Sequence, residues 1–255
     1  GGAGNFFKNL RKEIELNRDI EIVSPFNWTQ DVGLYGSVRR GLPWLPYCLR
    51  LDGIYYDKNN THGDNADLNK RIYKSIKNAS GIIFQSNFSK KLVESHYGEI
   101  DSLSTVILNG SSIYKKINTH EKKRKKRIIC SADWRVHKRF NAIVETVRKL
   151  RKNIDCELIV LGDVDKIQTF NEGYIKYLGH LSNQDVLIEI QKSDVFIHLC
   201  WLDVCPNAVI EAVACGVPVV CSNLGGTPEI IESTMGGCIA NCDYDVDISG
   251  LLDMY

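Results

Sequence analysis

Short apolar segments with the composition of buried strands alternate along the chain with segments whose apolar residues recur three and four positions apart. The first pattern is typical of strands covered on both faces, and the second of helices that pack one face against a sheet. This alternation predicts an α/β fold with parallel sheets. The strands expected from it are residues 20–23, 47–51, 81–85, 105–108, 127–130, 156–161, 174–177, 195–199 and 217–221.

One stretch, from Tyr114 to Arg127, has no apolar period and contains six consecutive basic residues from Lys122 onwards. Such a run is usually solvated, so we predict a basic linker at 115–127 between an N-terminal domain, 1–114, and a C-terminal domain, 128–255. A nuclear-localisation or phosphate-binding role for the run is the alternative. Because α/β proteins bind ligands at the carboxyl ends of their strands, we expect the site in a cleft between the two sheets.

Charge and composition exclude several classes of protein. The chain has 255 residues, with 32 Lys and Arg against 31 Asp and Glu, so its net charge of +1 creates no field that would hold a nucleic acid. No apolar run approaches the roughly 18–20 residues of a membrane span. No signal peptide opens the chain, which predicts a cytoplasmic location or a missing N-terminus. Peripheral contact with a membrane stays open.

The nine cysteines are odd in number and lie mostly inside apolar runs, which predicts reduced core residues. No Cys-x-x-Cys pair occurs, so we expect no structural metal. Two Asp-x-Asp triplets, 163–165 and 243–245, leave a Mg²⁺ site as a weaker alternative. We also predict no cofactor.

The most informative window is 202–220. It predicts a polar loop with Asp203 after a buried strand, a helix that begins near Pro206, a stop at Gly216 and a second buried strand. The free N–H groups of that helix would attract phosphate or sugar oxygens. Two carboxylates, Asp203 and Glu211, stand eight positions apart, one before the helix and one inside it.

This window resembles the signature of the family-four retaining glycosyltransferases, also named glycosyl transferases group 1, which have two Rossmann-like domains facing across a cleft, the GT-B architecture. The family usually has Glu where this chain has Asp203. The resemblance implies that Glu211 binds the donor ribose, that Asp203 faces the donor sugar, and that Asn207 contacts the donor.

Three other segments resemble the donor-binding loops of the same family. The loop 131–140 is similar to the family's basic loop, which implies that Arg135 and Lys138, with Arg139 as a third candidate, clamp the donor pyrophosphate. The turn at His180 and Leu181 resembles the one that lies against the nucleotide base. Residues 223–229 resemble the family's glycine-rich turn, and a plain tight turn before a helix explains them equally. Their donor-binding candidates are Gly225, Gly226 and Thr227.

The N-terminal half resembles the family less closely. Gly2 and Gly4 are similar to a glycine-rich loop that runs into the first helix beside the donor. Asp52 stands at the end of a buried strand, where many relatives carry a catalytic-cleft residue, so the resemblance makes it a catalytic candidate. An acid there can accept a hydrogen bond from donor sugar or acceptor, and a structural ion pair with Arg50 is the alternative.

The resemblance as a whole implies a retaining, metal-independent transfer of a sugar from a nucleotide-diphosphate donor to a glycan, lipid or other acceptor. Relatives usually exceed 300 residues, so the chain is either a fragment or a reduced form. The alternatives are a non-catalytic subunit that binds nucleotide sugars or glycans, and a sugar-nucleotide epimerase or hydrolase on the same fold.

Overall fold

The computed structural model describes residues 2–16, 19–23, 31–39, 44–55, 64–112, 114 and 125–242. These residues form two compact units, one up to Asn109 and one from Gly110, and each unit has its own parallel sheet. The predicted α/β class with two parallel sheets is therefore confirmed. Within the described part of the chain, no helix has both the length and the apolar character that crossing a bilayer requires.

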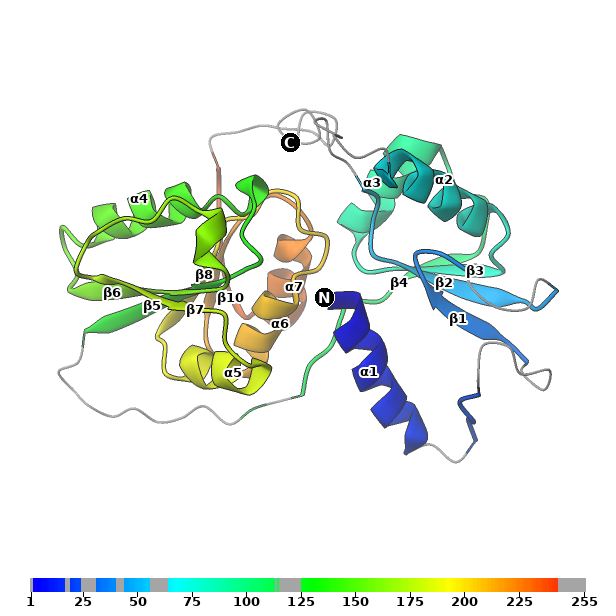
Figure 1. Ribbon diagram of the computed structural model, residues 1–255, viewed down its shortest axis with the longest axis horizontal. Coiled ribbons are helices and arrows are strands. Elements are labelled where there is room, and N and C mark those ends of the chain that lie inside the picture. Colours follow the sequence, from blue (N-terminus) through cyan, green and yellow to red (C-terminus); the bar gives the residue numbers. More distant parts are fainter. Residues whose placement is uncertain are drawn as a thin grey trace. The chain divides into compact units, whose positions relative to one another are not determined.

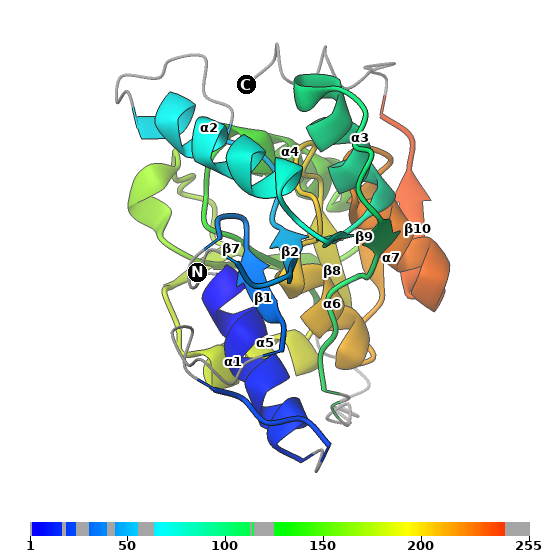
Figure 2. The same ribbon diagram turned by 90° about the vertical axis from the view of Figure 1, so that its right-hand side faces the viewer.

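The N-terminal unit has a four-stranded sheet in the order β1-β2-β3-β4, and all its strands are parallel. Helices α2 and α3 lie on one face of the sheet and α1 on the other (Figures 1 and 2). Leu49, Leu51, Ile82 and Phe84 are buried between these layers. The elements are α1 (Gly2–Glu15), β1 (Gly33–Gly36), β2 (Tyr47–Leu51), α2 (Asp64–Lys77), β3 (Gly81–Phe84), α3 (Asn87–Tyr97) and β4 (Ser104–Val106).

Two predictions for this unit are wrong. Residues 20–23 form no strand, because Ile20 and Ile22 stay exposed and no strand in the described part of the chain pairs with the segment. The first strand is β1 instead, which the pattern could not reveal because its sequence, Gly-Leu-Tyr-Gly, is poor in strand-forming residues. Gly2 and Gly4 belong to α1 and not to a loop before it.

The C-terminal unit has a six-stranded parallel sheet in the order β10-β9-β8-β5-β6-β7. The order reverses at β5, whose neighbours are β8 and β6. Helix α4 covers one face and α5 the other (Figure 1), with α6 packed beside α5 and α7 beside α6. The elements are β5 (Lys126–Ser131), η1 (Val136–Lys138), α4 (Phe140–Leu150), β6 (Cys156–Leu161), η2 (Val164–Lys166), β7 (Ile175–Gly179), α5 (Asn183–Gln191), β8 (Val195–His198), α6 (Asn207–Ala214), β9 (Val219–Ser222), α7 (Thr227–Thr234) and β10 (Gly237–Ala240).

The predicted linker extends too far. Lys126 and Arg127 belong to β5, because hydrogen bonds to β6 and a pairing with Asp194 hold them in the sheet despite their charge. The rest of the run up to residue 124 lies outside the described residues, as does the triplet 243–245. The first compact unit ends at Asn109, earlier than the predicted boundary.

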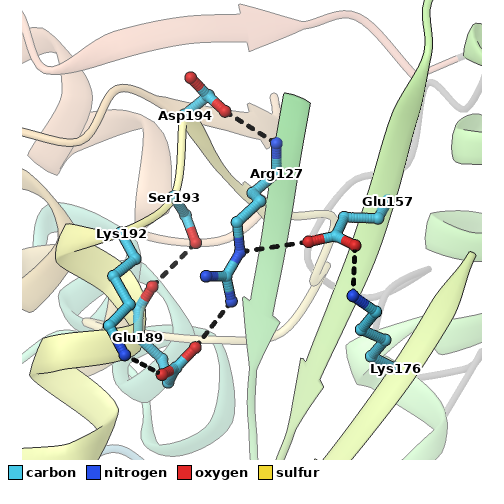
Figure 3. Close-up of polar contacts among 7 residues, drawn as sticks. All are labelled: Arg127, Glu157, Lys176, Glu189, Lys192, Ser193 and Asp194. Atoms are coloured by element: carbon cyan, nitrogen blue, oxygen red, sulfur yellow. Dashed lines mark hydrogen bonds and ion pairs between the residues drawn. The ribbon is translucent and has the colours of Figure 1, made fainter. Parts of the chain in front are cut away.

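The amino-terminal edge of this sheet carries a half-buried network of charges (Figure 3). Arg127 on β5 lies opposite Glu157 on β6, with Nε 3.5 Å from Oε1. Its Nη2 donates to Glu189 of α5 at 2.7 Å, and its backbone N–H donates to Asp194 at the same distance. Lys176 and Lys192 pair with the far sides of the two glutamates. The network joins three strands to α5 at the edge opposite the candidate site.

Candidate functional site

The reversal of strand order in the C-terminal sheet brings two loops together. Lys138 ends η1 in the loop after β5, and Asp203 lies in the loop after β8, the neighbouring strand. In doubly wound sheets this reversal is where ligands bind. The Lys138 ammonium donates to Asp203 Oδ2, and both side chains are mostly buried. The structure thus joins two predicted site residues that stand 65 positions apart.

The two partners hold each other in the charged state. Burial opposes the charge on Asp203, but the Lys138 ammonium outweighs it, and the pKa of this carboxyl is lowered. Burial likewise opposes the charge on Lys138, and Asp203 overcomes it, so the pKa of the amine is raised. The pair is therefore an ion pair at neutral pH.

Two buried histidines flank this ion pair. His198, the last residue of β8, has its Nε2 3.7 Å from Asp203 Oδ2, and His137 lies in η1 next to Lys138. Burial, together with the neighbouring Lys138 charge, lowers the pKa of each imidazole to about 4. Both rings are therefore neutral at pH 7. Neither histidine was predicted, because a lone His in an apolar run has no sequence signature of a site.

His198, Cys200 and Asp203 bring their potential metal-ligating atoms within 4.8 Å of one another. Burial raises the pKa of the Cys200 thiol to about 12, so the sulfur keeps its proton. The positive charge next to this group comes from Lys138. Spacing rules for zinc sites missed the grouping because the three residues stand at irregular intervals.

The other predicted cations lie differently. Arg139 adopts a left-handed backbone conformation (φ 54°) between η1 and α4, and its guanidinium lies 5.3 Å from the centre of the Trp201 ring. It therefore faces the same loop as Lys138. Arg135 is exposed, and its Nη2 donates to Asp133 at 2.9 Å. The structure brings Arg139 to the loop after β8, and it shows Arg135 paired with its own loop.

The two carboxylates of the 202–220 window lie in opposite environments. Helix α6 begins at Asn207, after Pro206 in the N-cap position, so its first N–H groups lie beside the loop with Asp203. The side chain of Glu211, one turn into the helix, has no hydrogen bond or ion pair with any residue that the structure describes. Burial raises the pKa of Glu211. Asp203 is held by a cation, whereas the Glu211 carboxylate has no ionic partner among the described residues.

The glycine-rich turn packs directly against the Asp203 loop. Gly226 N–H donates to the Asp203 carbonyl at 2.7 Å, and a Cβ on Gly225 would lie 2.9 Å from the same oxygen. Gly225 also has φ +75°, which favours glycine. Thr227 begins α7 and is fully buried, and its hydroxyl has no hydrogen-bond partner among the described residues. The turn thus has a structural reason for its glycines besides the predicted donor contact.

The predicted base-binding residues His180 and Leu181 follow β7. His180 is exposed at the same carboxyl edge as Lys138, but β6 separates its strand from β5.

Asp52 follows β2, and its Oδ1 accepts from Arg50 Nη1 at 2.5 Å, which is the expected ion pair. Gln85 also donates to that oxygen, a contact that sequence reasoning missed.

Comparisons with known proteins identify relatives of the chain by sequence. O-antigen chain mannosyltransferase B of Escherichia coli is 35% identical over 76 residues, 30% of this chain and 19% of that protein. N-acetyl-alpha-D-glucosaminyl L-malate synthase of Bacillus anthracis is 27% identical over 134 residues, 49% and 34% respectively. The matched segments therefore span a fifth to a third of these relatives.

The crystal structure of Anabaena HepE in complex with UDP-glucose superposes with a TM-score of 0.63 at 18% identity, over 82% of this chain and 62% of that one. Its likeness places the two Rossmann-like units in the GT-B fold. The family model described as "Glycosyl transferases group 1" matches residues 113–249, more than half of the chain. Fold and family match thus agree with the prediction, and the chain belongs to the glycosyl transferases group 1 family.

Proposed function

We propose that the chain is a glycosyltransferase that moves a sugar from a nucleotide-diphosphate donor to a glycan, lipid or other acceptor. The observation that carries the proposal is the contact of Lys138 with Asp203, in the loop that leads into the N-terminus of α6, at the strand-order reversal. An ammonium and free helix N–H groups at one edge are suited to a diphosphate. The relatives are sugar transferases or synthases by name, and HepE was crystallised with UDP-glucose.

The roles we propose follow from the charges of the site. Lys138 and Arg139 neutralise the leaving diphosphate together with the N-termini of α6 and α7. Glu211 accepts hydrogen bonds from the donor ribose, because it is the carboxylate without a partner. Asp203 faces the sugar, and the incoming phosphate competes with it for the Lys138 ammonium. Arg135 reaches the diphosphate only after leaving Asp133.

We further propose that transfer retains the anomeric configuration and needs no metal. Retention rests on the family resemblance. In such enzymes the leaving phosphate helps to deprotonate the acceptor on the same face of the sugar. Metal independence is supported by the cations already present, which can balance the diphosphate charge. Turnover that persists in EDTA and a product with the donor's anomeric configuration in NMR spectra would support both statements.

The first experiment is a thermal-shift screen with UDP, GDP, ADP and their common sugar conjugates. A ligand that binds only the folded state stabilises it by about 2.7 kcal/mol at a hundredfold excess over Kd. We expect a shift with one nucleotide that is lost in Glu211→Ala. Glu232→Ala, a charge removed from α7, is the matched control and should leave the shift unchanged. No shift with any nucleotide would refute the proposal.

A non-catalytic subunit that binds nucleotide sugars is the second candidate. The observation that favours it is the ion pair between Lys138 and Asp203. In this pair the ammonium and the carboxylate bind each other, so neither group is left to act on a donor. Binding of a nucleotide sugar with no release of the nucleoside diphosphate, in water or with added acceptors, would support this candidate. Turnover that is lost in Glu211→Ala would exclude it.

A further inference from the structure

Four side chains at the carboxyl edge of the N-terminal sheet form a closed ring of hydrogen bonds. Arg50 Nη1 donates to Asp52 Oδ1 at 2.5 Å, and its Nη2 donates to Asn109 Oδ1. Asn109 Nδ2 donates to Gln85 Oε1 at 3.0 Å. Gln85 Nε2 closes the ring by donating to Asp52 Oδ1 at 2.5 Å. The residues come from β2 and from the segments that follow β2, β3 and β4.

The chemistry of the groups allows only one orientation of this ring. A guanidinium only donates and an ionised carboxylate only accepts, so each amide must turn its oxygen toward Arg50 or Asn109 and its nitrogen onward. Gln85 Nε2 is fixed further because it also donates to the Leu51 carbonyl at 3.0 Å. Reversing either amide would bring two donors or two acceptors together.

The ring is also held by contacts with the rest of the N-terminal unit. The Arg50 side chain is only 3% exposed, and its guanidinium lies 3.6 Å from the centre of the Phe6 ring of α1. Gln85 is 4% exposed. A cation stacked on an aromatic face and tied to two acceptors has little freedom to move. The ring is therefore a rigid base for its carboxylate member, which reaches solvent.

That member is Asp52, whose side chain is 33% exposed. Both hydrogen bonds from the ring converge on Oδ1. Its Oδ2 has no partner among the residues that the structure describes. A carboxylate with one oxygen fixed and the other open is suited to accept a hydrogen bond from a hydroxyl group.

We propose that Arg50, Gln85 and Asn109 are positioning residues that hold Asp52 so that Oδ2 accepts a hydrogen bond from a sugar hydroxyl. The hydroxyl belongs to the donor sugar or to the acceptor, which offer the same chemistry. This inference rests on the proposed glycosyl transfer and deepens it, because it assigns a function to the charged end of β2. The competing view is that the ring only stabilises the fold.

A double-mutant cycle on the full chain tests the inference, with UDP-glucose and GDP-mannose as donors. Asp52→Asn keeps an oxygen in the ring but replaces the open Oδ2 by an NH₂ group. Gln85→Met keeps the volume of Gln85 and removes its hydrogen bonds. We expect each variant to lower kcat/KM by about 10- to 100-fold, the effect of losing a hydrogen bond to a charged group. In the Asp52→Asn background, Gln85→Met should add less than about twofold.

Two further variants separate positioning from stability. Asn69→Leu removes an amide that bonds the Tyr55 backbone in the same unit, outside the ring, and should leave kcat/KM within about twofold. Asn109→Leu breaks the ring at a less buried residue and replaces Gln85→Met if that variant does not fold. Full additivity with Asp52→Asn, or wild-type rates in Gln85→Met and Asn109→Leu, would overturn the inference.

Two assays identify the hydroxyl. Hydrolysis of the donor by water needs no acceptor, whereas transfer to added p-nitrophenyl glycosides does. A loss in both assays places the Asp52 contact on the donor sugar, and a loss in transfer alone places it on the acceptor; either result supports the inference. A wild-type chain that neither binds nor turns over a donor refutes the proposed function and the inference with it. If the wild-type chain turns over a donor and the ring variants do so at the same rate, the inference alone is refuted.

Discussion

The charge network at the amino-terminal edge of the C-terminal sheet allows a sharp test of what a half-buried ion pair contributes. Arg127→Met keeps most of the apolar stem of the side chain and removes its charge. The contact with Glu189 at 2.7 Å and the one with Glu157 at 3.5 Å are lost together. Both glutamates stay behind in a setting where they are only 13–16% exposed.

The expected loss follows from burial and from the partners that remain. Removing one member of a buried ion pair costs about 3–5 kcal/mol, because the other charge is left in a poorly solvated place. Here Lys176 still lies 2.6 Å from Glu157 and Lys192 lies 2.7 Å from Glu189. These lysines compensate part of the loss, so we expect Arg127→Met to lower the free energy of unfolding by about 2–3 kcal/mol.

Arg148→Met is the matched control in the same unit. Arg148 also contacts two glutamates, Glu145 and Glu172, but its side chain is more exposed. Its loss should be clearly smaller, because water already screens the pairs. Amide hydrogen exchange of peptides from β5 and β6 measures the opening free energy of this unit alone. If Arg127→Met is no more destabilising than Arg148→Met, the reasoning from burial is wrong.

Three further predictions concern the candidate donor site. The folded state keeps His137 and His198 neutral (pKa about 4), whereas the unfolded chain binds protons from about pH 6.5, so lowering the pH from 7 to 4 should reduce the unfolding free energy by up to ~3 kcal/mol per histidine. Urea melts across this range should show that the unfolding free energy of His198→Leu depends less steeply on pH. Lys138→Met should destabilise the unit by about 3–5 kcal/mol in the same melts, and adding Asp203→Leu should restore most of it, because no buried charge then remains. Gly225→Ala should lower Tm more than Gly98→Ala, since both sites have positive φ but only the first Cβ meets backbone, the Asp203 carbonyl; equal losses would contradict this.

Periodicity predicted most elements because it reports burial directly. The strands at 47–51 and 156–161 have the predicted limits, and the helix near Pro206 begins at Asn207. The pattern failed where an apolar segment found no cover, at 20–23, and where a strand was too short and rich in glycine, at β1. It also placed Arg127 in a linker, because a charged residue can enter a strand when other side chains supply its counter-charges.

The site shows the same division. The resemblance to the family's motifs marked Asp203, Glu211, Lys138 and Asp52 as candidates, since each stands where the family's pattern places a residue of the cleft. Nothing in the spacing could show that Lys138 and Asp203 would bind each other, or that Glu211 would have no partner. Gln85 and His198 carried no signal at all, because their importance lies entirely in what they contact.

The sequence alone therefore determined the α/β class, the two sheets and the approximate places of most strands, because these depend on the local order of apolar and polar residues, and its motifs determined the family. The tertiary structure decided which strand ends become neighbours. The reversal of strand order at β5 brings Lys138 to Asp203, and the parallel order of β2, β3 and β4 brings Asp52, Gln85 and Asn109 into one ring. Such contacts join residues far apart in the chain, and only the packed sheet fixes their distances.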